Sequence, residues 1–155
     1  MTSSALLAAI STALASRVAA AQGGMEVAES LAEASDFLAA APARWRLILL
    51  WEGYGSHAAA REGMTTHCVT AVVQQLRGLA AARTPGLLSF ADRLEQVSAW
   101  MRALRFPDGT GADSAGFSLS DSRWLETAKT ARAHAITFSL IAALPPFPET
   151  IPLSF

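Results

Sequence analysis

The sequence predicts an α+β fold, in which a mainly antiparallel or mixed sheet of about three to four strands packs against amphipathic helices. Two long apolar segments, 44–52 and 65–76, alternate with a period of two on either side of a glycine-bearing loop, as adjacent antiparallel strands do. Three other segments carry apolar residues at helical spacing. A chain of 155 residues has room for one core, so we expect a single domain over 1–144 and an extended arm over 145–155.

The N-terminal part of the chain predicts two helices. In the first, apolar residues recur every four positions after possible caps at Ser3 and Ser4, and Gly23 with Gly24 ends the helix. The second helix is expected over about 25–40, with Pro42 closing it. The apolar residues that define the two helices are Leu6, Ile10, Leu14 and Val18, and then Val27, Leu31, Ala34 and Leu38.

Four carboxylates would gather on the far side of the second expected helix. No basic residue follows four positions later to relieve their mutual repulsion. We interpret this group as a solvated face or, alternatively, as a docking surface for arginines of a neighbouring subunit. Its members are Glu26, Glu29, Glu33 and Asp36.

The rest of the chain predicts three long strands and one further helix. Trp45 and Leu47 begin a strand that is covered on both sides at its centre, and the loop 53–63 leads to the next strand, which ends at Gly78. Thr84 and Pro85 are typical of a helix start, and an amphipathic pattern continues to Leu104. A long loop over 107–122, with one short strand at 117–119, precedes a last strand over 134–141.

Composition indicates a subunit of an assembly. Only 16% of the residues are charged and the mean hydropathy is +0.30, so the isolated chain should expose an unusually apolar surface. The formal net charge of −1 gives no basic field for nucleic acid.

We expect no membrane span and no signal sequence, because Arg17 interrupts the N-terminal apolar run and no basic residue precedes it. The single cysteine, Cys68, forms no internal disulfide.

The sequence contains no recognisable catalytic motif. His57, His67 and His134 lack the spacing of metal ligands, and Asp108, Asp113 and Asp121 lack the pattern of a calcium loop. Neither a phosphate-binding glycine loop nor a nucleophile elbow is present. We therefore expect no cofactor, no metal and no enzymatic activity. The alternative is a small-ligand-binding enzyme domain, which a deep pocket holding His134 with a carboxylate would favour.

The order of elements resembles the tail terminator (tail completion) proteins of long-tailed bacteriophages. The segments that carry the resemblance are the alanine-rich N-terminal helices, RWRLILLWEGYG, TTHCVTAVVQQLRGL, LLSFADRLEQVSAWMRALRF, a Gly/Asp loop ending in RWLE, and HAITFSLIAAL before a proline. The resemblance implies a virion protein, located in the tail or neck after assembly in the host cytoplasm. It also implies a hexameric ring that caps the tail tube and joins it to the head connector, with DNA able to pass through its lumen. Another neck component, such as a head-tail connector or a tail-tube-like subunit, is the alternative.

Three segments are predicted to contact other subunits. In the loops 53–63 and 107–122 we expect Tyr54 and Phe117 to anchor the tube or connector instead of joining the core. The proline-rich arm 145–155 is expected to lie on a neighbouring subunit, or alternatively to pack on its own domain. Its apolar side chains are Phe147, Ile151, Leu153 and Phe155.

Overall fold

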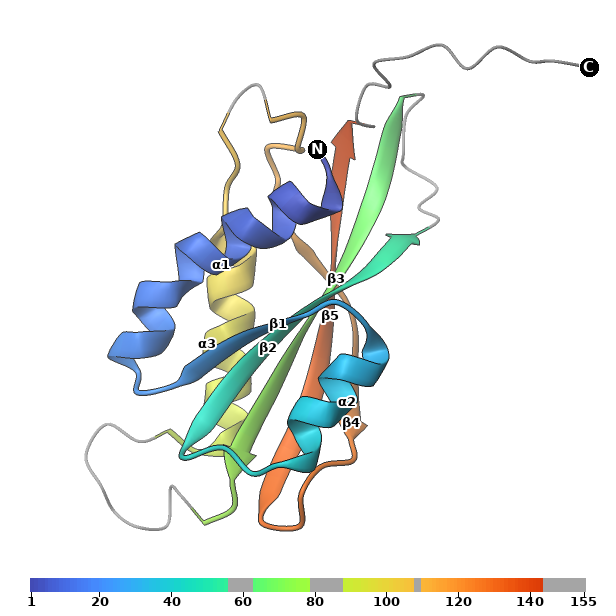
Figure 1. The fold of residues 1–155 in the computed structure, drawn as a ribbon. Coiled ribbons are helices and arrows are strands. Elements are labelled where there is room, and N and C mark those ends of the chain that lie inside the picture. The colour runs from blue at the N-terminus through green and yellow to red at the C-terminus, as the bar shows by residue number, and fades with distance from the viewer. Residues whose placement is uncertain (56–62, 79–87, 108–109, 144–155) are drawn as a thin grey trace, which may run out of the picture.

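The computed structural model describes residues 1–55, 63–78, 88–107 and 110–143. They form three helices and a five-stranded mixed sheet in the order β1-β2-β3-β5-β4 (Figure 1). The α+β class is confirmed, with more strands than expected. The elements are α1 (Ser3–Ala20), β1 (Gly24–Ala28), α2 (Leu31–Ala39), β2 (Trp45–Gly55), β3 (Met64–Leu76), α3 (Phe90–Ala103), β4 (Ser118–Leu125) and β5 (Ala131–Ala143).

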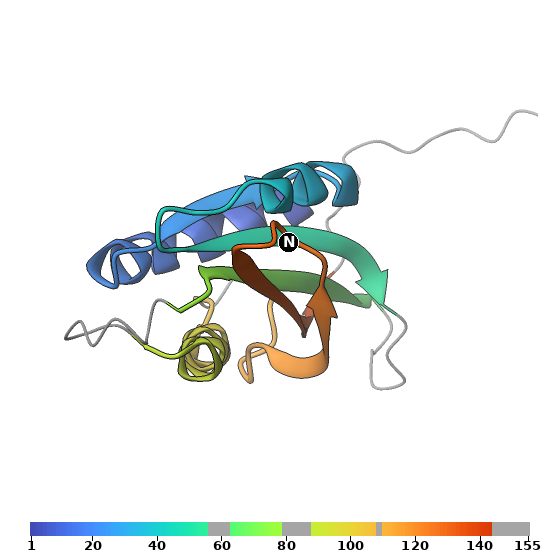
Figure 2. The same ribbon diagram turned by 90° about the horizontal axis from the view of Figure 1, so that it is seen from below.

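Helices cover both faces of the sheet. On one face α1 and α3 enclose the larger core, which includes Leu47, Val73 and Phe138. Along that face α1 lies beside β1 and β2, whereas α3 lies towards β5 and β4 (Figure 2). On the other face α2 packs over Ile48, Leu50 and the alanines of β5. Strands β2, β3 and β5 are therefore buried on two sides, which explains their long apolar sequences.

Helix α1 forms as predicted, with different end residues. Thr2, not Ser3 or Ser4, is the N-cap, and its hydroxyl accepts a hydrogen bond of 3.1 Å from the N–H of Ala5. At the C-terminus Gln22 adopts a left-handed conformation with φ 61°, and the N–H of Gly23 donates to the carbonyl of Val18. The helix is long and apolar enough to cross a membrane by composition, but its Leu6, Ile10, Leu14 and Val18 are buried in the core.

The prediction of one helix over 25–40 is wrong. Residues 24–28 form β1, which pairs in parallel with β2, and α2 begins only at Leu31 after the N-cap Ser30. Helical spacing of Val27 and Leu31 was misleading because backbone pairing with β2 outweighs the local helical preference. Glu26 and Glu29 therefore precede the helix, and the four carboxylates do not form a stripe on one helix.

Within 110–122 more residues belong to a strand than predicted. The short strand expected at 117–119 is the beginning of β4, which extends through Leu125. Phe117 is only 4% exposed and packs between the rings of Phe106 and Phe138. The prediction that Phe117 contacts a partner instead of the core is therefore corrected, because its large apolar ring fills the core edge near β5.

Helix α3 begins later than the predicted Thr84–Pro85 start. Its N-cap is Ser89, whose hydroxyl accepts from the N–H of Asp92, and residues 84 and 85 lie outside the described residues. The helix carries one unexpected core residue: Arg93 is 1% exposed, and its guanidinium lies 4.3 Å from the centre of the Trp45 ring. Burial lowers the pKa of Arg93.

The turn that follows α1 packs against the indole of Trp45 in the larger core. The indole N–H of Trp45 donates to the carbonyl of Ala21, and the ring lies directly against Gly23. A Cβ atom at Gly23 would be 2.5 Å from Cζ2 of Trp45, whereas one at Gly24 would meet no atom within 4 Å.

We predict that Gly23→Ala lowers the free energy of unfolding by about 1–3 kcal/mol, because the new methyl group must displace a packed indole. Gly24→Ala is the matched control and should change it by less than about 0.5 kcal/mol. Urea unfolding followed by tryptophan fluorescence measures both. Equal effects of the two substitutions would contradict the packing described for Gly23.

His67 is a buried histidine that accepts a hydrogen bond. Its side chain is fully buried, and the indole N–H of Trp51 donates to its Nδ1 at 3.0 Å. Burial lowers the pKa of His67 below its ordinary value of about 6.5. Protonation at Nδ1 would also break the hydrogen bond that the Trp51 indole donates to His67.

We therefore predict that acid weakens the fold through His67. A folded pKa below the unfolded one means that the stability contributed by neutral His67 is present above about pH 6.5 and is lost as the pH falls towards the folded pKa. The free energy of unfolding should decrease from pH 7 to pH 5, and His67→Gln should decrease this slope. Part of this pH dependence of the free energy of unfolding will remain, because burial also lowers the pKa of His134. An unchanged slope in His67→Gln would contradict this role.

Candidate interaction surfaces

The two outer strands of the sheet are short and lie at opposite ends of it. Within the described residues β1 pairs only with β2, and β4 pairs only with β5. With neighbouring strands about 4.8 Å apart, the two edges are separated by roughly 19 Å. Each edge presents backbone N–H and C=O groups on its outer side, which makes it a template for pairing with another chain.

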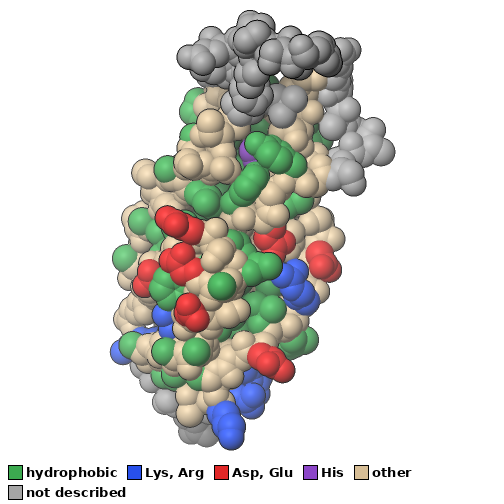
Figure 3. Space-filling view, turned by 45° about the vertical axis from the view of Figure 1, so that its right-hand side comes forward, with side chains coloured by type: hydrophobic (Ala, Val, Ile, Leu, Met, Phe, Trp, Pro, Cys, Tyr) green, Lys and Arg blue, Asp and Glu red, His purple; other side chains and the backbone are tan. Residues whose placement is uncertain are grey.

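The β1 edge is acidic and partly apolar. Glu26 lies on the face of β1 that α2 covers, since it pairs with Ile48, and Val27 on the opposite face is 38% exposed. Leu31, at the start of α2, is 64% exposed. Figure 3 shows carboxylates over the middle of the molecule, with Lys and Arg side chains at its lower end and also beside carboxylates on the right. All four predicted carboxylates thus lie on β1 or on α2 and the residues before it, although not as one helix face.

One of these carboxylates has a local structural role. The N–H of Glu33 donates to the hydroxyl of Ser30, and the carboxylate of Glu33 accepts from the N–H of Glu29 at 3.1 Å. Such reciprocal bonds satisfy the free N–H groups at the start of a helix. Glu33 therefore supports α2, whereas Glu26, Glu29 and Asp36 are exposed and make no side-chain hydrogen bond within the described part of the chain.

The β4 edge carries two of the most exposed apolar side chains in the described residues. Leu119 is 54% exposed and Trp124 is 65% exposed. The Trp124 ring stands edge-on to His134, with centroids 4.7 Å apart, and leans on Phe90 at 5.7 Å. On the opposite face of β4, Arg123 donates to Glu52 at 3.1 Å while its side chain remains 44% exposed.

A groove of about 610 Å³ separates α3 from β4 and β5. Leu94 and Ala99 contribute from α3, Leu119 and Ile136 from the sheet, and polar groups lie between them. His134 and Glu95 both line this groove, as do Ser98 and Ser122. No hydrogen bond joins these four side chains in the described ranges, and burial lowers the pKa of His134. The groove contains a neutral imidazole but no assembled nucleophile and base.

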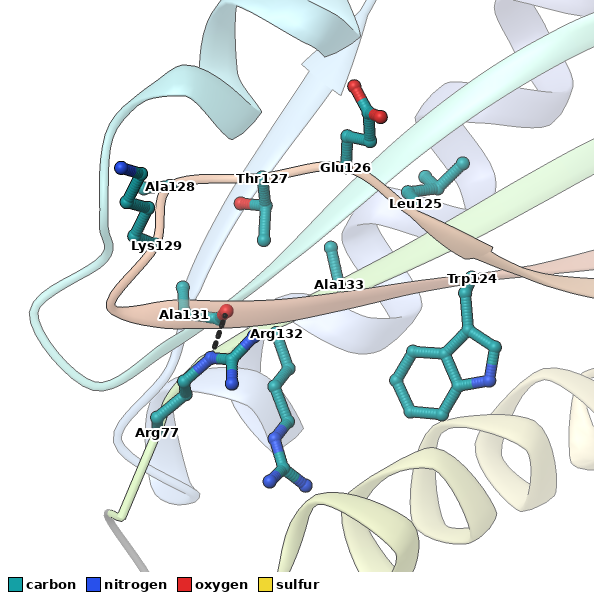
Figure 4. A pocket seen from close by; sticks show the side chains of 10 residues that line it. All are labelled: Arg77, Trp124, Leu125, Glu126, Thr127, Ala128, Lys129, Ala131, Arg132 and Ala133. Carbon is teal, nitrogen blue, oxygen red and sulfur yellow. Dashed lines mark hydrogen bonds between the residues drawn. The ribbon is translucent and has the colours of Figure 1, made fainter.

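A second hollow, of about 490 Å³, lies at the turn between β4 and β5 (Figure 4). Arg77 and Arg132 extend on the same side of β5, and Nε of Arg77 donates to the carbonyl of Ala131 at 3.1 Å. Lys129 and Glu126 line the same hollow from the turn. Three cations with one carboxylate make this corner locally basic, in contrast to the β1 edge.

Tyr54, the predicted anchor for a partner, is exposed and belongs to the end of β2 instead of the loop. It is 55% exposed, and its ring lies edge-on to Trp51 and tilted against His67, with centroids 5.2 Å and 5.3 Å away. The remaining loop residues 56–62 and the arm residues Phe147, Ile151, Leu153 and Phe155 lie outside the described residues. In the described ranges no group of three or more His, Cys, Asp or Glu is arranged to hold a metal ion.

Sequence reasoning missed Leu119, Arg123 and Trp124. An edge strand exposed on both faces has no apolar period, so the three serines and one aspartate of β4 are indistinguishable from a loop in the sequence. A bulge between Leu119 and Asp121 also shifts the alternation by one residue. A weak signal remained, because Trp124 is a large apolar residue in an otherwise polar segment.

The chain matches no protein-family model, and it matches no curated protein sequence.

Proposed function

We propose that this protein is a structural subunit that assembles with copies of itself into a closed ring, and that the ring terminates a phage tail. It would cap the finished tail tube and join it to the head connector, with no catalytic step. The observation that carries the assembly part is the pair of outer strands, β1 and β4, each of which has only one strand partner among the described residues and which lie at opposite ends of one sheet. The assignment to a tail rests on the resemblance in element order.

Two different edges favour a ring over a two-fold dimer. An isologous dimer uses one patch twice, whereas a head-to-tail contact uses two unlike patches and closes into a ring when the rotation permits. Here the β1 edge is acidic, and the far corner of the sheet carries Arg77, Lys129 and Arg132. Like-charged edges would repel each other across a two-fold axis, while unlike edges attract.

Exposed apolar side chains lie at both edges. Val27 and Leu31 lie at one end of the sheet, and Leu119 and Trp124 lie at the other. Aromatic side chains are enriched in protein interfaces, and a tryptophan that is 65% exposed leaves a large apolar area in water. The low fraction of charged residues in the whole chain is consistent with such coverage.

We predict a single closed oligomer, most simply a hexamer, on mass photometry of the purified chain or of the chain mixed with tail tubes. Assembly only on the tube is compatible with the proposal, because a preformed end can align the first subunits. A protein that stays monomeric at tens of micromolar, alone and with tubes, would contradict it. Another neck component remains the alternative within this class, and binding to a portal or connector instead of the tube would identify it.

One observation favours a different class, a small-ligand-binding enzyme domain: the groove between α3 and β4 holds His134 together with Glu95. If that groove acts on a small ligand, His134→Gln and Glu95→Gln should each abolish the thermal stabilisation produced by the ligand while leaving the fold intact. If the ring proposal holds, both variants should assemble as the wild type does. Assembly measured by mass photometry, together with a small-molecule thermal-shift screen, separates the two functions.

A further inference from the structure

We infer that in the assembled ring β4 of one copy pairs antiparallel with β1 of the next copy, through residues 121–125 and 24–28. This inference rests on the proposed ring. It specifies which backbone segments meet, in which direction and in which register.

The direction of pairing follows from the connectivity of the sheet. Strand β1 is parallel to β2, β2 is antiparallel to β3, and β3 is antiparallel to β5, so β1 and β5 have the same direction. Strand β4 is antiparallel to β5. When the sheet of one copy continues into the sheet of the next with the same orientation, β4 therefore meets an antiparallel β1. Antiparallel pairing is the more stable of the two ladder types per residue.

The register follows from the lengths of the two regular segments. A bulge interrupts β4 between Leu119 and Asp121, so its regular portion runs from Asp121 to Leu125, which is five residues. Strand β1 is also five residues long. Full overlap of these segments places Glu26 opposite Arg123, Met25 opposite Trp124 and Val27 opposite Ser122.

This register also matches the two faces of the sheets. Met25 and Val27 lie on the face covered by α1, because they pair with Leu47 and Leu49 of the larger core. Trp124 and Ser122 lie on that same face, opposite His134 and Ile136. The exposed Trp124 ring would thus contact Met25, and Val27 would lie at the groove between α3 and β4.

The other face brings opposite charges together. Glu26 lies on the α2 side through its partner Ile48, and Arg123 lies on that side through its partner Ala135. Cross-strand neighbours have Cβ atoms about 5 Å apart, within reach of an ion pair. Arg123 has free donors for it, since only one of its nitrogens is used by Glu52. A slip by one residue would place Glu26 against the apolar face of β4, so the charged pair also fixes the register.

The test exploits the head-to-tail geometry with two charge reversals, Glu26→Arg and Arg123→Glu. Either variant alone would face like charges at every interface, and the concentration needed for half-assembly should rise about tenfold or more. An equimolar mixture can alternate around an even-numbered ring. Each interface then joins either the two introduced side chains, an arginine at position 26 and a glutamate at position 123, or the native Glu26 and Arg123, so mixing should restore assembly. Because recovery requires both chains to fold, misfolding of either one cannot imitate this result.

A matched control and a crosslink complete the experiment. Asp36→Arg reverses an exposed charge on α2 away from the paired segments and should leave the half-assembly concentration within about twofold of wild type. In a Cys68→Ala background, Val27→Cys with Ser122→Cys should yield disulfide-linked multimers on a non-reducing gel. Val27→Cys with Ser118→Cys, which lies beyond the bulge and on the opposite face of β4, should yield few.

The outcomes separate this inference from the proposed function. Rings that form equally well from both single variants, or a mixture no better than its components, would overturn the β4–β1 pairing while leaving a ring intact. A wild-type chain that stays monomeric with and without tubes would overturn the ring and the pairing together.

Discussion

The burial of β3 on both faces is the constraint on which the rest of the structure depends. This strand pairs along its length with β2 on one side and β5 on the other, so it is enclosed by the sheet as well as by the helices. The side-chain amide of Gln74 is fully buried, so it must find partners inside the protein. Gln74 accepts from Arg46 and donates to Ala40 and to Thr127, which ties the end of α2 and the β4–β5 turn to the centre of the sheet.

That arrangement determines which strands form the two edges of the sheet. Because three long strands occupy the middle, the edges are the short strands β1 and β4. Strand β1 leads into α2, and β4 leads into the turn that carries Lys129. The carboxylates at β1, Glu26 and the adjacent Glu29, and the cations at the β4–β5 turn come from segments far apart in sequence. Neither group suggests an interface by itself. Their positions at opposite ends of one sheet give the molecule two sheet edges of unlike charge.

The long buried elements could be predicted from sequence, and the short exposed ones could not. Trp45, Leu47 and Leu49 specify β2 because a strand covered by helices has a strong apolar signal, and Leu6 to Val18 specify α1 for the same reason. Strand β1 was mistaken for helix because five residues carry little pattern and their state is decided by pairing with β2. Phe117 was assigned to a partner contact because a glycine-rich segment conceals how close it lies to Phe106 and Phe138.

The shortness of β1 and of the regular part of β4 limits the strength of the proposed contact between copies. A ladder of about five residue pairs with one exposed tryptophan falls in the size range of weak, transient contacts. On the proposed ring model, one such contact would dissociate readily, whereas the last contact that closes a ring is intramolecular and benefits from a high effective concentration. Partial rings would then be unstable and complete rings persistent. A preformed tube end that holds several subunits side by side would act as the nucleus, which links completion of the ring to completion of the tail.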